Sequence, residues 1–66
     1  MTTHASFAPA LMDKNTAAWY LNISLRKLDT LQAQGRITPL ALDGKRQYNR
    51  EELDAYARSL PEWKSA

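Results

Sequence analysis

The stretch Leu21-Asn22-Ile23-Ser24-Leu25-Arg26-Lys27-Leu28-Asp29-Thr30-Leu31-Gln32-Ala33-Gln34-Gly35-Arg36 decides the fold. Its residues predict the end of one helix, a tight turn and a second helix from about Leu25 to Gln34. Ser24 is a favourable N-cap, because its hydroxyl can accept a hydrogen bond from a backbone N–H of the first turn. Gly35 suits the left-handed conformation that closes a helix. The second helix therefore has defined ends.

This second helix has one apolar face and one polar face. Leu28 and Leu31 lie on the same side of a wheel with 3.6 residues per turn. The opposite side presents Arg26, Asp29, Thr30 and Ala33, with Lys27 and Gln34 on its flank. One face is therefore available for burial and the other for contact with a partner.

The residues before this helix predict a shorter one that leads into the turn. Asp13 is placed as the N-cap of a helix from Lys14 to about Leu21. Its apolar stripe consists of Ala17, Ala18 and Leu21, broadened by Trp19 or Tyr20. Asn22 tolerates positive φ, and Ile23 can be buried in the corner between the helices. The pattern is that of a helix-turn-helix.

The second informative stretch is Leu40-Ala41-Leu42-Asp43-Gly44-Lys45-Arg46-Gln47-Tyr48. Asp-Gly between potential strand residues is a strong hairpin signal, so we expect a two-stranded β-hairpin with Lys45 and Arg46 near its tip. Apolar contacts are expected from Leu40, Leu42 and Tyr48. An isolated hairpin is only marginally stable, so this one must pack against the helices.

A final helix is predicted after the hairpin. Asn49 is a suitable N-cap, and Glu52 follows three residues later as in a capping box. The expected buried face consists of Leu53, Tyr56, Ala57 and Leu60, and Pro61 ends the helix. We expect a flexible arm over residues 1–11, one domain over residues 12–60 and a tail over residues 61–66, with Trp63 folding back onto the domain.

Size and composition exclude several classes of protein. A chain of 66 residues has room for one domain with a thin core. It has no cysteine and a single histidine, His4, so we expect neither a disulfide framework nor a metal or other cofactor. No nucleophile, base and orienting group form a recognisable motif, and Gly35 and Gly44 are isolated, so we expect no enzymatic activity. No stretch is apolar enough for a membrane span or a signal peptide, which predicts a cytoplasmic protein without a membrane partner.

Charge is distributed unevenly along the chain. The formal net charge is only +2, but residues 14–50 hold seven Lys or Arg and two Asp. Residues 51–66 hold two basic and four acidic residues. A solvated mixed surface would explain such an asymmetry, and so would a polyanionic partner of the central segment.

Together these elements resemble the excisionase-like winged-helix proteins, a family related in fold to the DNA-binding domains of MerR-type regulators. The resemblance covers roughly residues 12–60. It rests on Ser24-Leu25 opening the second helix, Gly35-Arg36-Ile37 leaving it, Asp43-Gly44 in the wing and Arg46-Gln47-Tyr48 returning from it. It implies a mostly α fold with a small β-hairpin: a single winged helix-turn-helix domain. Asp29 and Thr30 make the second helix less positive than is usual in the family.

The family's second helix enters the DNA major groove, and its wing follows the backbone or the minor groove. By position, the resemblance implies recognition-helix contacts from Arg26, Lys27, Thr30 and Gln34, and wing contacts from Lys45 and Arg46. Possible phosphate contacts are Ser24, Arg36 and Arg50. Each of these cations could instead be an ordinary solvated surface residue. For Arg36 a further alternative is an ion pair with an acidic residue of the last helix. Asp29 is either a surface residue or an acceptor for cytosine N4.

The resemblance is closest to phage excisionases, also called recombination directionality factors. It implies double-stranded DNA as partner, with neighbouring copies of the chain and a tyrosine integrase, and DNA bending during prophage excision. It implies no small-molecule substrate. A transcriptional regulator of a phage or mobile element is the alternative within DNA binding. An adaptor that binds another protein through the same helical face, with Trp63 as an anchor, is the alternative outside it.

Overall fold

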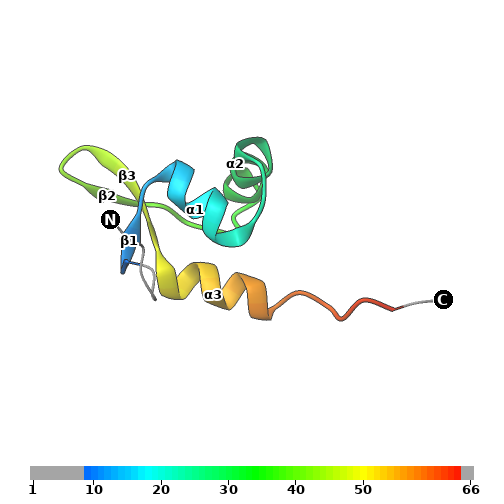
Figure 1. The fold of residues 1–66 in the computed structure, drawn as a ribbon. Coiled ribbons are helices and arrows are strands. Elements are labelled where there is room, and N and C mark those ends of the chain that lie inside the picture. The colour runs from blue at the N-terminus through cyan, green and yellow to red at the C-terminus, as the bar shows by residue number, and fades with distance from the viewer. Residues whose placement is uncertain (1–8, 65–66) are drawn as a thin grey trace.

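The computed structural model describes residues 9–64, which form three helices and three short strands (Figure 1). In chain order they are β1 (Leu11–Met12), α1 (Lys14–Leu21), α2 (Leu25–Ala33), β2 (Leu40–Leu42), β3 (Lys45–Asn49) and α3 (Arg50–Arg58). The strands make one antiparallel sheet in the order β1-β3-β2. The fold is thus mixed α/β, whereas the sequence led us to expect a mostly α domain with a two-stranded hairpin.

α1 has the predicted ends. The Asp13 carboxylate accepts a hydrogen bond from the Thr16 N–H at 2.8 Å. Asn22 is left-handed, with φ 59°, and the following N–H of Ile23 donates to the Ala18 carbonyl at 2.9 Å. This is the Schellman arrangement, in which a left-handed residue turns the chain away from the helix axis. It brings the partly buried Ile23 against the core, as expected for the corner between α1 and α2.

α2 repeats this arrangement. The Ser24 hydroxyl accepts from the Lys27 N–H at 3.0 Å. Gly35 has φ +75°, and the Arg36 N–H donates to the Leu31 carbonyl at 2.9 Å. The helix ends at Ala33, one residue earlier than predicted, with Gln34 as its C-cap. Both caps named from the sequence therefore form.

The hairpin forms at the predicted position, and a third strand joins it. Asp43 and Gly44 have φ 53° and 76°, which is typical of the type I′ turn that matches the twist of a hairpin. Leu42 pairs with Lys45 across this turn. On the other side of β3, Met12 pairs with Tyr48. Residues 1–8 of the predicted arm lie outside the described residues, but its last residue, Leu11, belongs to β1.

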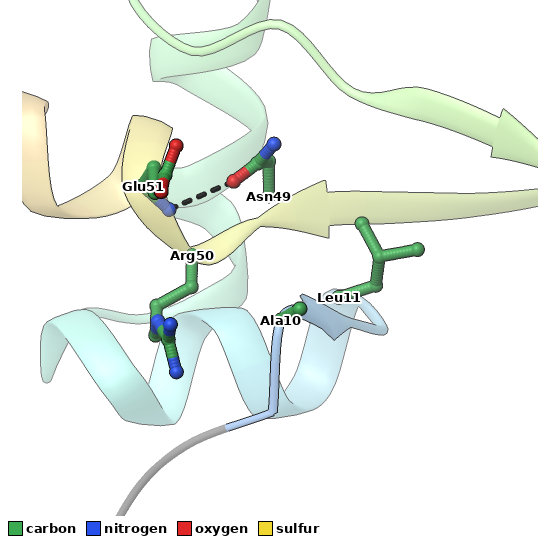
Figure 2. A pocket seen from close by; sticks show the side chains of 5 residues that line it. All are labelled: Ala10, Leu11, Asn49, Arg50 and Glu51. Atoms are coloured by element: carbon green, nitrogen blue, oxygen red, sulfur yellow. Dashed lines mark hydrogen bonds between the residues drawn. The ribbon is translucent and has the colours of Figure 1, made fainter.

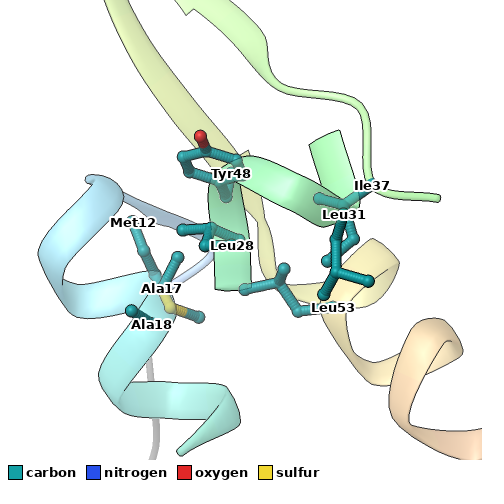
Figure 3. Close-up of a cluster of buried hydrophobic side chains, with 8 residues drawn as sticks. All are labelled: Met12, Ala17, Ala18, Leu28, Leu31, Ile37, Tyr48 and Leu53. Atoms are coloured by element: carbon teal, nitrogen blue, oxygen red, sulfur yellow. The ribbon is translucent and has the colours of Figure 1, made fainter. Parts of the chain in front are cut away.

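The core lies between α1, α2, α3 and the inner face of β1 and β3 (Figure 3). It consists of Met12, Ala17, Ala18, Leu28, Leu31, Ile37, Tyr48 and Leu53. A fully buried leucine contributes roughly 1.5–3 kcal/mol to the free energy of folding, so Leu28 and Leu31 fix the inner face of α2. Their burial leaves the opposite face of α2 in solvent, as the wheel predicts.

Several expected core contacts are wrong. Leu40 and Leu42 are 45% and 48% exposed, because β2 is an edge strand of the sheet. Of the two residues proposed to broaden the apolar stripe of α1, Tyr20 packs partly buried against the core, as predicted, whereas Trp19 is 69% exposed. Trp63 is 92% exposed, so the tail does not fold back; Figure 1 shows the chain after α3 leading away from the helices.

α3 begins at the predicted N-cap but differs from its prediction in the role of Glu52 and in its end. The Asn49 side chain accepts from the Glu51 N–H at 2.8 Å, so Asn49 is the N-cap. Glu52 does not complete a capping box; its carboxylate accepts from the Thr38 N–H at 2.8 Å and holds the segment after α2. The helix ends at Arg58, two residues before the predicted end. The last part of the expected buried face, Ala57 and Leu60, is exposed.

Candidate nucleic-acid interface

The predicted contact residues of α2 share its outward face. Arg26, Lys27 and Thr30 are exposed, and so is Gln34 at the C-cap. The Thr30 hydroxyl donates to the Arg26 carbonyl at 3.0 Å, which leaves its oxygen free to accept. Ser24 is exposed at the N-cap, and its hydroxyl hydrogen remains available after its oxygen has accepted from Lys27. This face therefore offers two cations, an amide and two hydroxyl groups to a ligand.

The hairpin is tied to α2 by three polar side chains. The Tyr48 hydroxyl donates to Gln32 Oε1 at 2.8 Å, and Arg46 Nη1 donates to the same oxygen at 3.4 Å and to the Tyr48 hydroxyl at 3.5 Å. Figure 3 shows the Tyr48 hydroxyl directed away from the other core side chains. Since Tyr48 is also buried in the core, its ring fixes the position from which the hydroxyl reaches α2. These contacts, here named the Gln32 bridge, hold β3 and α2 together.

Asp29 occupies the boundary between α2, α1 and the hairpin. Lys14 Nζ lies 2.8 Å from Asp29 Oδ1 and donates to Oδ2 at 2.9 Å. Arg46 Nη1 lies 3.8 Å from Oδ1. The hydrogen bond to Tyr48 and the charge of Asp29 both raise the pKa of Arg46. Asp29 thus stands between two cations from different elements.

Contacts of Asp29 and Gln32 join α1, α2 and β3, and this junction together with the neighbouring exposed polar residues of α2 and the hairpin is here named the α2–hairpin face. It comprises Lys14, Arg26, Lys27, Asp29, Thr30, Gln32, Gln34, Lys45 and Arg46. It carries five cations and one carboxylate, and Asp43 at the hairpin tip adds a second. Such an excess of positive charge on a rigid surface attracts polyanions.

Arg36 and Arg50 lie in other surroundings. The Arg36 guanidinium lies 5.3 Å from the centre of the Tyr56 ring, a cation–π contact with α3 that was not among the roles expected for it. The Arg50 N–H donates to the Ala10 carbonyl at 2.9 Å. Arg50 lines a pocket between β1 and the start of α3, and its side chain is directed toward α1 (Figure 2).

The Arg50 side chain also influences α1. Tyr20 donates a hydrogen bond to Asp54 at 2.5 Å, which raises the pKa of Tyr20, and the nearby Arg50 lowers it in part. The Tyr20–Asp54 contact joins α1 to α3 and agrees with a packing role for this tyrosine. Arg50 therefore belongs to the α1–α3 side of the domain.

Two residues of the α2–hairpin face, Lys14 and Gln32, were missing from the sequence prediction, and so was the part that the Tyr48 hydroxyl plays in holding it. Lys14 joins it through Asp29, fifteen positions away, and Gln32 and the Tyr48 hydroxyl join it through each other, sixteen positions apart. No local sequence pattern predicts these pairs. The helical wheel of α2 does place Gln32 at the edge between its apolar and polar faces, which is where a contact with a neighbouring element is expected.

Other kinds of site find no support in the part of the chain that the structure describes. No three His, Cys, Asp or Glu side chains among residues 9–64 come together in a group that could hold a metal ion. None of the helices in this range is long and apolar enough to cross a membrane. Comparison of the chain with protein-family models, curated proteins and solved structures finds no match.

Proposed function

We propose that the chain is a winged helix-turn-helix protein that binds double-stranded DNA, with α2 as the reading helix and the β2–β3 hairpin as the wing. The observation that carries this proposal is the Gln32 bridge. It joins the hairpin to α2 through the core residue Tyr48, so Arg46 is held in place beside the helix that carries Arg26 and Lys27. Preorganisation matters because a ligand then meets the charges without having to order two separate elements.

The dimensions and chemistry of α2 suit the major groove. An α-helix with side chains is about 10–12 Å across, and the groove is about 12 Å wide. Arg26 can make a bidentate contact to guanine, and Thr30 can reach a neighbouring base edge. Lys27 and Lys45 lie on the flank and at the hairpin, where they would neutralise phosphates. The two elements would then divide base recognition and backbone contact between them.

We further propose that this binding serves excision of a phage or prophage, as the resemblance to excisionases implies. Several copies would bind neighbouring sites, bend the DNA and help a tyrosine integrase to assemble the excision complex. Bending a short site costs on the order of 1–6 kcal/mol, which protein contacts along the curve must offset. A single small domain in a chain of 66 residues covers little DNA, so neighbouring copies or a partner would supply those contacts.

Titration with duplex DNA tests the binding surface. Arg26→Ala should relax sequence preference by roughly 1–3 kcal/mol, because it removes a base contact. The pair Lys45→Ala and Arg46→Ala should weaken binding to all sequences and lower the salt slope by about 0.9 for each lost phosphate contact. Arg58→Ala, which removes an exposed cation of α3, is the matched control and should change neither. Unchanged affinity and salt slope in both test variants would refute the proposed surface.

The biological role needs its own assay. Excision should be measured with an integrase and an attachment site, with and without this protein, and the protein should raise the yield of excised product. Promoter repression without any effect on excision would instead make it a transcriptional regulator. DNA binding weakens steeply as the salt concentration rises. Binding of a protein partner whose affinity hardly changes with salt would therefore indicate an adaptor that uses apolar contacts.

A further inference from the structure

Asp29 is an anomaly on a surface that otherwise favours polyanions. Its carboxylate lies on the outward side of α2, one turn after Arg26, and its side chain is 51% exposed. A carboxylate at this place repels phosphate and lowers affinity for any DNA sequence. Because this carboxylate lowers affinity for DNA, its presence calls for a compensating role, and the contacts that hold it in place indicate one.

The structure does orient Asp29. Lys14 contacts both carboxylate oxygens, at 2.8 and 2.9 Å, and Arg46 lies 3.8 Å from one of them. The two contacts come from α1 and β3, so the carboxylate is held from two sides. Each carboxylate oxygen has two lone pairs, and the contacts with Lys14 leave part of this accepting capacity facing solvent.

An oriented acceptor in the major groove has one favoured base. Cytosine presents its N4 amine there as a donor, and Asp or Glu accepts from it, whereas guanine and thymine present the acceptors O6, N7 or O4. Adenine also presents a donor, N6, but its neighbouring N7 is an acceptor that repels the second carboxylate oxygen, so cytosine is favoured. We propose that Asp29 is a specificity-determining residue that selects a cytosine in the DNA site, with Lys14 as the residue that positions its carboxylate. This inference rests on the proposed DNA-binding function and assigns Asp29 a role beyond the surface ion pair.

The chemistry of the Asp29→Asn variant makes the inference sharp. Asparagine carries a donor as well as an acceptor and pairs in bidentate fashion with adenine N6 and N7. The variant should therefore change its preferred base at one position from cytosine to adenine. Removal of the negative charge should also raise affinity for random duplex by roughly 3–10-fold at low salt, the effect of about one additional phosphate contact.

The experiment is selection of bound duplexes from a random pool, followed by titration of the selected duplex and of a random one. Wild type should select cytosine at a position where Asp29→Asn selects adenine and Asp29→Ala shows no preference. Lys14→Met should weaken the cytosine preference without creating one for adenine. Glu62→Gln, which removes one negative charge from the tail, is the charge-matched control and should leave the selected sequence unchanged.

The possible failures are distinguishable. If wild type selects a sequence that Asp29→Asn and Asp29→Ala also select at every position, the role of Asp29 is refuted and the proposed function stands. The same conclusion follows if Asp29→Asn and Glu62→Gln raise affinity for all duplexes equally, because bulk charge then explains the effect. If wild type binds no duplex, the proposed function fails and this inference fails with it. Circular dichroism of each variant shows that a lost preference does not come from unfolding.

Discussion

Asn22 ends α1 in a conformation that most residues avoid. Its φ of 59° lies in the left-handed region, which costs an ordinary L-residue about 1–2 kcal/mol and costs glycine nothing. Asn22→Ala should therefore lower the free energy of unfolding by roughly 1 kcal/mol, while Asn22→Gly should leave it unchanged or slightly higher. Urea denaturation followed by circular dichroism measures both variants. Equal stability of the two would show that the backbone at this turn does not control the junction of α1 and α2.

Asp13 links the stability of α1 to pH. Hydrogen bonds from Thr16 hold the pKa of Asp13 below its usual value of 3.8. Because folding favours the carboxylate form, the stabilisation is complete above the unfolded-state pKa and is lost as pH falls through the lower folded-state pKa. Asp13→Asn keeps a capping oxygen that cannot titrate.

Thermal unfolding at several pH values tests this link. Between about pH 5 and pH 2, Asp13→Asn should lose less stability than wild type, since one of the titrating carboxylates is absent. Asp13→Ala, which has no capping oxygen, should be less stable than Asp13→Asn at every pH. Parallel curves for wild type and Asp13→Asn would mean that Asp13 titrates alike in the folded and unfolded chain.

These residues also mark what the sequence can predict. Asp13, Asn22, Ser24 and Gly35 act on backbone groups within five positions, so their types and spacing were enough to place the helix ends. The ion pair between Lys14 and Asp29 depends on how α1 crosses α2, which no local spacing encodes. The candidate cations could thus be named from the sequence, but the contacts that orient them could not.

Among the elements, the junction between α2 and the hairpin offers a clean test. Tyr48→Phe keeps the buried ring and removes the hydroxyl that donates to Gln32. The loss of one hydrogen bond should lower the free energy of unfolding by about 0.5–1.5 kcal/mol. If the Gln32 bridge orients the wing, duplex affinity should fall as well, although no charge has been removed.

Gln32→Ala is the second arm of this test, because it removes the same bridge from the side of α2. Both variants should weaken duplex binding while the salt slope remains that of wild type. Wild-type affinity in both variants would show that the hairpin needs no support from α2 to bind DNA.

The elements were predictable to the extent that their signals are local. The Asp43-Gly44 turn predicted the hairpin. Capping residues, together with apolar residues at helical spacing, predicted the three helices. β1 was missed because two residues have no periodicity, and the strand exists only through its pairing with β3. The same dependence on neighbours explains Leu40 and Leu42, whose apolar character says nothing about whether a helix covers β2.

For the molecule as a whole, size sets a narrow margin of stability. A single core in a domain below about 70 residues rarely supplies more than 3–5 kcal/mol, and this chain has no cysteine to add a disulfide. Eight buried apolar residues hold the described part of the chain together. A ligand that binds only the folded state should therefore have a large effect on thermal unfolding.

That effect provides the last test. At a free duplex concentration of about 100 Kd, binding adds roughly 2.7 kcal/mol to the free energy of unfolding. In a domain of this size 1 kcal/mol shifts the midpoint by about 4–8 °C, so a cognate duplex should raise it by about 10–20 °C. The Lys45→Ala and Arg46→Ala double variant should show a smaller shift at the same duplex concentration, since its Kd is higher. A midpoint that a large excess of cognate duplex leaves unchanged would contradict binding through the folded α2–hairpin face.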